Sequence, residues 1–301
     1  MAVAYESVSI GTWEGNQSGE TLVITKPTGL AVDDLMILHM SSVGDTGDPG
    51  TYGWTATGWT QVLSNADTST SPKIVMDVWK KTADAGDVAA SDFTFTHNEN
   101  DVGWTNGAIY RISGAVTGNI QTASSLVRAD TTPTYANTIT QTYPDSLLLF
   151  LVTAVDNAAS GSVASYAITT DNPTWTERYD SYADSAAFGG AGYGDGLMAG
   201  ATAMRTATTA TGDATVTLTN FDGSVGALII IPPVVNITQT PTVLSATFSV
   251  EAPTITGDAN TTPTELSATF TVQAPTVSFP TPTYTNLAKS ATSTFTNPDK
   301  S

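Results

Sequence analysis

The sequence predicts an all-β protein: an antiparallel, jelly-roll-like β-sandwich built from two related halves, followed by a short repetitive C-terminal region. Short windows in which Thr, Val, Ile and aromatic residues alternate are separated by Gly, Asp, Asn and Pro, which is typical of strands and turns. Long amphipathic helical windows are absent, so an antiparallel sandwich is favoured over mixed α/β folds. The clearest strand windows are residues 20–24, 74–79, 93–97, 108–112 and 215–219.

Features of the first half return in the second half in the same order, at offsets of 112 to 123 residues. The sequence at 34–38 (DLMIL) returns at 146–150 (SLLLF), 58–60 (GWT) at 174–176 (TWT), 93–96 (FTFT) at 216–219 (VTLT), and 107–110 (GAIY) at 226–229 (GALI). The two halves can form two domains or interleave as one sandwich. We expect one sandwich over residues 1–233, with pseudo-repeats of about 1–115 and 116–233, because 113–131 contains no clear linker and each half is short of recognisable strands.

The body is expected to end at Pro232 and Pro233, because neither residue can donate a hydrogen bond to a β-ladder. All six tryptophans precede this point, so the residues that can form a core lie in the body. The tail, 234–301, consists of units 240–261, 262–283 and 284–301, and its segment 244–255 returns almost unchanged at 266–277. Such Thr/Pro-rich strand repeats suit spacing or docking. Its candidate contact residues are Phe248, Phe270, Tyr284 and Phe295.

The formal net charge of −18 comes from 28 acidic and 10 basic residues. Because no basic patch is present, we expect neither nucleic-acid binding nor attachment to anionic membranes. Zero cysteine excludes disulfides and thiolate sites. The N-terminus lacks the basic and apolar regions of a signal peptide, and no apolar stretch reaches the length of a bilayer span, so synthesis in a cytoplasm is expected.

Catalysis is not expected. His39 and His97 are the only histidines, and each is interpreted as a structural histidine in or at the end of a strand. No nucleophile elbow accompanies them, and their separation does not suit a metal site. Paired carboxylates such as Asp33 and Asp34 are better interpreted as turn residues than as a glycosidase pair.

We expect no cofactor, and bound calcium is the alternative. Segments 44–48 and 98–101 place hard oxygen donors in loops, as calcium prefers, but neither matches a known calcium-loop pattern. Solvated acidic loops are the favoured interpretation.

Aromatic residues in Gly-rich segments are candidate contacts for sugars or proteins. Trp59 and Trp175 recur in both halves, so we assign them to the core. Tyr52, Trp54 and Tyr193 are the candidates for a surface that binds a partner.

Three blocks carry a resemblance. They are 33–38 (DDLMIL) with 58–60 (GWT), then 78–87 (VWKKTADAGD) leading into 93–96 (FTFT), and 108–114 (AIYRISG). Together they resemble a β-sandwich domain of tailed-phage virion proteins and some bacterial surface proteins, and the tail resembles C-terminal repeats of phage structural proteins. The resemblance implies a virion location and carries no catalytic or binding residues.

We therefore expect a phage virion structural protein that decorates the capsid or forms a head fibre. Its partners would be the major capsid protein or other virion proteins, with repeated weak contacts made durable by multivalency. By analogy we expect a homo-oligomer, and a trimer in particular. The alternatives are a tail-fibre or surface adhesin that binds host glycans, and a non-viral bacterial surface protein.

Overall fold

The computed structural model describes residues 2–14, 21–44, 54–67, 73–97, 102–128, 134–156, 162–183, 195–219 and 223–234. Contacts divide the chain into units 1–236 and 237–301, and every described residue belongs to the first. The repeat units of the tail lie outside the described residues. Over the described residues the protein is all-β, with antiparallel sheets as the sequence predicts. Its described helices are α1 (Ala85–Ala89) and the 3-10 turn η2 (Thr117–Asn119).

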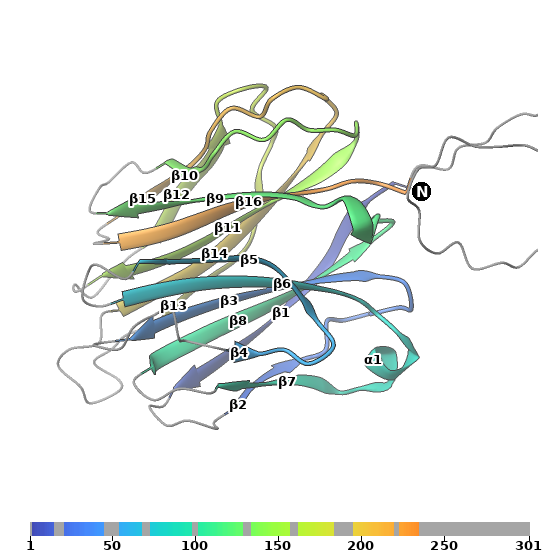
Figure 1. Cartoon of the computed structure of the whole chain (residues 1–301), viewed down its shortest axis with the longest axis vertical. Coiled ribbons are helices and arrows are strands. Elements are labelled where there is room, and N and C mark those ends of the chain that lie inside the picture. The colour runs from blue at the N-terminus through green and yellow to red at the C-terminus, as the bar shows by residue number, and fades with distance from the viewer. Residues whose placement is uncertain are drawn as a thin grey trace, which may run out of the picture. The chain divides into compact units, whose positions relative to one another are not determined.

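Each half forms eight strands in two sheets (Figure 1). In the first half, the five-stranded sheet has the order β1-β8-β3-β6-β5 and the three-stranded sheet has the order β2-β7-β4. The strands are β1 (Ala4–Glu14), β2 (Thr21–Thr25), β3 (Leu35–Gly44), β4 (Trp54–Thr55), β5 (Thr60–Asp67), β6 (Lys73–Thr82), β7 (Asp92–His97) and β8 (Val102–Ser113).

The second half repeats this topology strand for strand. Its five-stranded sheet, read from the corresponding edge, is β9-β16-β11-β14-β13, and its three-stranded sheet is β10-β15-β12. Adding eight to each strand number of the first half gives the order of the second. The strands are β9 (Gln121–Arg128), β10 (Thr134–Ala136), β11 (Ser146–Asp156), β12 (Ser162–Ile168), β13 (Thr176–Ala183), β14 (Asp195–Arg205), β15 (Ala214–Thr219) and β16 (Gly223–Ile231).

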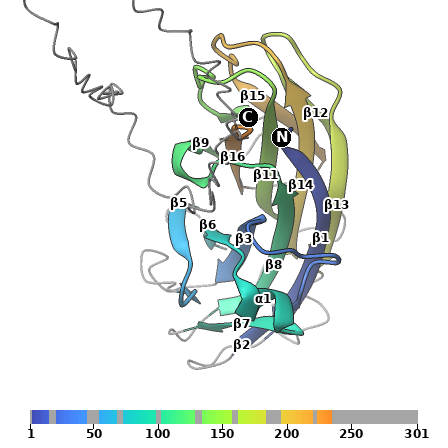
Figure 2. The ribbon, with the colours of Figure 1, turned by 90° about the vertical axis from the view of Figure 1, so that its right-hand side faces the viewer.

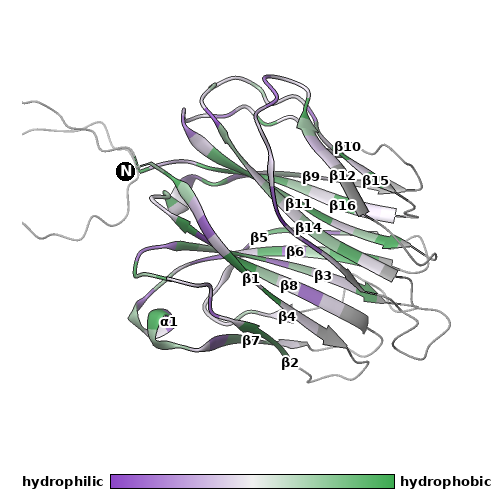
Figure 3. Cartoon of the chain, turned by 180° about the vertical axis from the view of Figure 1, so that it is seen from behind, coloured by the Kyte–Doolittle hydropathy of each residue, from purple (hydrophilic) through white to green (hydrophobic). Residues whose placement is uncertain are grey.

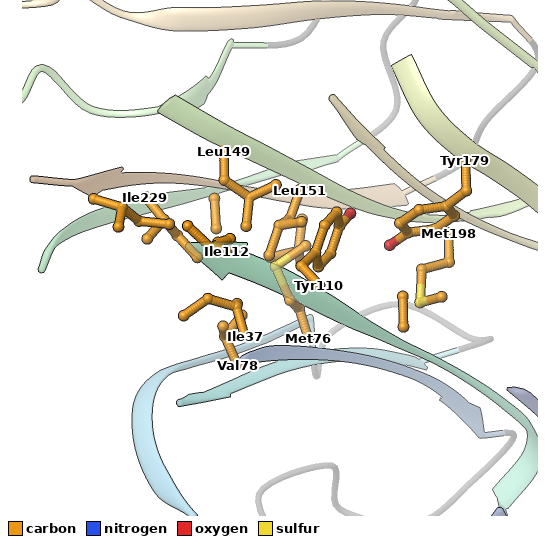
Figure 4. Packing of buried hydrophobic residues seen from close by; sticks show 14 of the residues in the cluster. Ile37, Met76, Val78, Tyr110, Ile112, Leu149, Leu151, Tyr179, Met198 and Ile229 are labelled. Carbon is orange, nitrogen blue, oxygen red and sulfur yellow. The ribbon is translucent and has the colours of Figure 1, made fainter. Parts of the chain in front are cut away.

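The four sheets form four layers, because the two five-stranded sheets pack face to face and each carries its three-stranded sheet on its outer face. The central core contains ten buried residues from each half, among them Ile37, Tyr110, Leu149 and Ile229 (Figure 4). The outer cores are each formed within one half. Figure 2, which views the body from the end where the chain begins, shows the strands of the two large sheets next to each other.

The single interleaved sandwich that we expected is therefore wrong. Each half contains its own two-sheet sandwich, and the halves pack back to back. The cause of the error is visible in β11 and β16, whose described side chains are all buried. One face of these strands packs on the central core and the other on an outer core, so both faces are apolar. The strands of the large sheets are accordingly rich in hydrophobic residues (Figure 3).

The outer sheets follow the alternation that the sequence suggests. β2 alternates exposed and buried residues, with Leu22 and Ile24 facing the core and Val23 facing solvent. Trp59 packs edge-on against Phe93 and Phe95, with ring centroids 5.9 Å apart in both pairs. Trp175 lies 6.0 Å from Phe150 between ring centroids. Both tryptophans are half-buried and pack against the outer cores, in agreement with their assignment to core packing.

Strand direction alternates along the chain, so the connections separate into two groups at opposite ends of the body (Figure 1). Seven connections and both chain ends of the body lie at one end. We call these seven connections the braced end: residues 26–34, 56–59, 83–91, 114–120, 137–145, 169–175 and 206–213. The eight connections of the opposite end lie outside the described residues. Their sequences contain eight acidic residues and no Lys or Arg.

Truncation after Val234 is expected to leave a soluble body that unfolds cooperatively. The three cores are formed by residues 3–231, and the Val234 amide still donates to the Gly114 carbonyl at 2.8 Å. Urea unfolding of residues 1–234, followed by tryptophan fluorescence and circular dichroism, tests this. Aggregation of the truncated protein, or non-coincident transitions, would show that the tail completes the fold.

The central core also predicts a matched pair of substitutions. A Cβ added at Gly200 would lie 1.8 Å from the Tyr110 hydroxyl oxygen of the other half. Gly200→Ala is therefore expected to destabilise the body by about 1–3 kcal/mol, as overpacking does. Tyr110→Phe removes the clashing oxygen, so the double variant should recover most of the loss. Additive losses in a double-mutant cycle would contradict this packing.

Candidate functional site

A buried polar cluster lies between the two halves. His39 of β3 is fully buried. Its Nδ1 lies 2.6 Å from the Tyr179 hydroxyl, and its Nε2 lies 3.0 Å from the Thr153 hydroxyl. Both partners belong to the second half. A neutral imidazole satisfies this arrangement, since one ring nitrogen donates and the other accepts.

Burial determines the protonation states in this cluster. Burial lowers the pKa of His39 to about 3, so the ring is neutral at physiological pH. Burial also raises the pKa of Tyr179 and of Tyr110, whose ring centroids lie 5.7 Å apart. No described carboxylate hydrogen-bonds to His39. His39 is buried with both ring nitrogens hydrogen-bonded, as expected of a satisfied histidine in a strand. His97 ends β7, and its side chain lies outside those described.

Two further contacts join the halves at the margins of the central core. The Arg178 guanidinium of β13 lies 4.0 Å from the centroid of the Tyr5 ring of β1. On the other margin, the Asn65 amide of β5 donates to the Ser124 hydroxyl of β9 at 3.1 Å. The pairs β1/β13 and β5/β9 correspond under the strand equivalence, so the halves meet with the approximate symmetry of an isologous interface.

The first half contains a second buried ionisable group. Asp77 of β6 is 4% exposed and accepts a hydrogen bond from the Gln61 amide at 3.0 Å. Burial raises its pKa to about 6, although hydrogen bonds from Ser64 and Gln61 lower it. Asp77 therefore carries its charge at neutral pH at a cost in stability.

The braced end takes its name from the basic residues that tie its connections together. In the first half, Arg111 donates to Asp34 at 2.6 Å and to the Thr28 carbonyl at 3.2 Å. Lys81 pairs with Asp87 of α1 at 2.5 Å, and Lys26 donates to a carbonyl of the same helix. Each of these contacts links two segments at this end of the body.

Lys80 and Arg205 also hold connections at this end of the body. Lys80 of β6 donates to the Thr117 carbonyl at 2.7 Å, across to the connection between the halves. Arg205 of β14 donates to the Gln141 side chain at 3.2 Å and to the Thr209 carbonyl at 3.0 Å, and lies 3.5 Å from Asp171. Arg205 thus links three connections of the second half. Five cations brace six of the seven connections.

One shallow depression at the braced end resembles a ligand site. It has a volume of about 370 Å³ and is lined in part by Lys80, Lys81 and Thr117. Lys81 is already paired with Asp87 and lies 3.9 Å from Asp84. Two carboxylates therefore offset two ammonium groups, and the depression has no net charge with which to select an anion.

The predicted contact residues have different outcomes. Trp54 is 7% exposed, and its indole NH donates to the Ser42 hydroxyl at 3.0 Å, so its prediction as a surface residue is wrong. The Gly-rich segment gave no sign that β4 would pair with β7 and turn the ring inward. The other candidates lie outside the described residues: Tyr52, Tyr193, Phe248, Phe270, Tyr284 and Phe295.

The predicted calcium segments also lie mostly outside the described residues, which contain no group of three or more side chains suited to a metal ion. Nor is any helix of the described part long and apolar enough to span a membrane. Comparison of the chain with protein-family models, curated proteins and solved structures finds no match in any of the three.

Two of the buried ionisable groups, His39 and Asp77, predict opposite pH dependences. For His39, the unfolded pKa of about 6.5 exceeds the folded pKa of about 3, so its contribution to stability falls as pH drops below about 6.5. For Asp77, the folded pKa of about 6 exceeds 3.8, so stability falls as pH rises from about 4 to 6. In each case the free energy of unfolding changes by up to about 1.4 kcal/mol per pH unit.

Single variants should separate these slopes. Asp77→Asn is expected to gain about 2–3 kcal/mol over the wild type above pH 6 and nothing near pH 4. His39→Asn, which also removes packing, should lose least relative to the wild type near pH 4 and most near pH 7. Urea unfolding at several pH values measures both differences. Differences that do not change with pH would contradict the assigned protonation states.

Proposed function

We propose that the protein is a structural protein of a tailed-phage virion, most simply a capsid decoration or head-fibre protein. It would attach to the major capsid protein or another virion protein as a homo-oligomer, for which a trimer is our proposal. Many identical contacts, each weak, would give durable attachment through multivalency. The observation that carries the proposal is the division of the body into two unlike ends.

At one end the chain begins, the described body finishes at Val234, and the connections are braced. At the other end, eight connections contain eight acids and no Lys or Arg. A protein fixed to a shell at one end and displaying an acidic end to solvent would use this division, because like charge keeps displayed ends apart.

The fold supports the same proposal. In each half, strands alternate between two sheets in the order 1-8-3-6 and 2-7-4, with the fifth strand added at the edge of the larger sheet. We interpret each half as a jelly roll on this basis. Capsid proteins are among those that use this architecture, although a fold alone does not fix a function.

The alternative is an adhesin that binds host glycans. It is favoured by one observation: the connections that contain Tyr52 and Tyr193 join strands that end at the same, acidic end of the body. An aromatic ring can stack on the apolar face of a sugar, which is the contact that an adhesin of this kind would use.

Cryo-electron microscopy tests the proposal. The comparison is between virions of the phage that encodes this chain and virions of the same phage after the gene for the chain is deleted. We expect density that repeats over the icosahedral shell and disappears on deletion. Density confined to a tail tip or fibre, with the acidic end outward, would favour the adhesin. Absence of the protein from the particle would contradict both.

A further inference from the structure

The braced end presents a surface of short side chains. Among its seven connections, the only Lys, Arg, Glu or Gln residues are Lys26 and Gln141. Lys26 donates to the Val88 carbonyl, and the Gln141 amide donates to the Arg205 carbonyl at 3.0 Å. The exposed positions are mainly Thr, Ala, Gly, Asn and Asp. A partner that docks here would immobilise few flexible side chains, which lowers the entropic cost of binding.

The backbone of this surface is also held in place. All three described non-glycine residues with positive φ lie in these connections: Asp33 at 72°, Asp145 at 53° and Asp171 at 48°. Aspartate tolerates this region better than most residues, but the conformation persists only where the surroundings enforce it. Together with the five bracing cations, these residues make the surface pre-organised for binding.

Apolar contact groups are present on the same surface. The described residues include five exposed large hydrophobic side chains. Val32 lies in a connection of the braced end, and Met204 of β14 and Val234 after β16 lie next to its connections; their exposed fractions are 52%, 47% and 37%. The other two, Ile10 and Val23, lie along the side of the body in β1 and β2.

The charge of the surface indicates the chemistry of its partner. Its exposed charged residues are Asp33, Asp84, Asp145, Asp171 and Asp213, whereas its cations are used for bracing. Two copies placed braced end to braced end would repel one another. A partner that presents Lys or Arg around an apolar contact would complement it.

We propose that the braced end is a docking surface for a protein with a cationic, partly apolar contact surface. This inference rests on the proposed function, in which that protein belongs to the virion. It assigns attachment to the described body itself, at the end where the chain begins, in addition to any contact made by the tail.

The chain supplies a matched control for the test. Full-length protein with Val32→Arg and Met204→Arg changes one exposed hydrophobic residue in the braced end and one directly next to it. Full-length protein with Ile10→Arg and Val23→Arg makes the same chemical change at similarly exposed positions on the side. Binding of each to purified particles that lack the chain is measured by co-sedimentation, with melting temperatures recorded to confirm folding.

We expect the braced-end variant to bind at least about ten-fold more weakly, and the side variant to stay within about two-fold of the wild type. A second variant, Asp33→Asn with Asp145→Asn, keeps residues that tolerate positive φ and removes two charges. It should weaken binding and reduce its salt dependence, whereas Glu177→Gln with Asp180→Asn on β13 should not.

Each other outcome overturns the inference. Binding of both braced-end variants at the wild-type level, or loss of binding only in the side variant, would move the docking surface elsewhere while leaving the proposed function intact. Failure of the wild type to bind any particle would overturn the proposed function, and the inference with it.

Discussion

The packing of one five-stranded sheet on the other determines most of this structure. It buries ten hydrophobic residues from each half, so neither large sheet can expose its inner, apolar face to water. Because each large sheet also carries a three-stranded sheet, its inner strands must be apolar on both faces. The halves are therefore parts of one body, although every strand pairs only within its own half.

Apolar packing alone does not fix how two sheets align, since hydrophobic contact is non-directional. Directional contacts supply the alignment here. His39 reaches two hydroxyls of the opposite half, and the Tyr110 ring occupies the space that Gly200 leaves open. An unpaired imidazole in this core would be costly, so a shifted alignment that broke both hydrogen bonds is disfavoured. The cluster thus specifies one arrangement of the halves.

Sequence reasoning identified the fold class, the strand windows and the correspondence of the halves, because period-2 alternation and ordered repeats are local signals. It could not identify four layers. A run such as 147–152 is equally apolar whether it serves one core or two, and only the number of sheets distinguishes these cases. The prediction that Trp54 lies on the surface was wrong for a related reason, since the exposure of a side chain depends on which strand covers it. The bracing contacts were also missed: Arg111 and Asp34 are 77 residues apart, and no local pattern pairs them.

Comparison of the halves shows what the braced end requires. Asp33 and Asp145 occupy equivalent positions, two residues before Leu35 and Leu147, and both have positive φ. The basic residues that brace the connections, in contrast, do not occupy equivalent positions in the two halves. Leu35 pairs with Thr82 as Leu147 pairs with Met204, so Arg205 corresponds to Ala83 in the first half.

By the same register, Arg111 corresponds to Ile230, which is buried in the outer core of the second half. The two halves thus share a backbone but hold their connections with different cations at different positions. Both halves thus hold these connections with basic side chains, and the connections form the surface next to both chain ends of the described body.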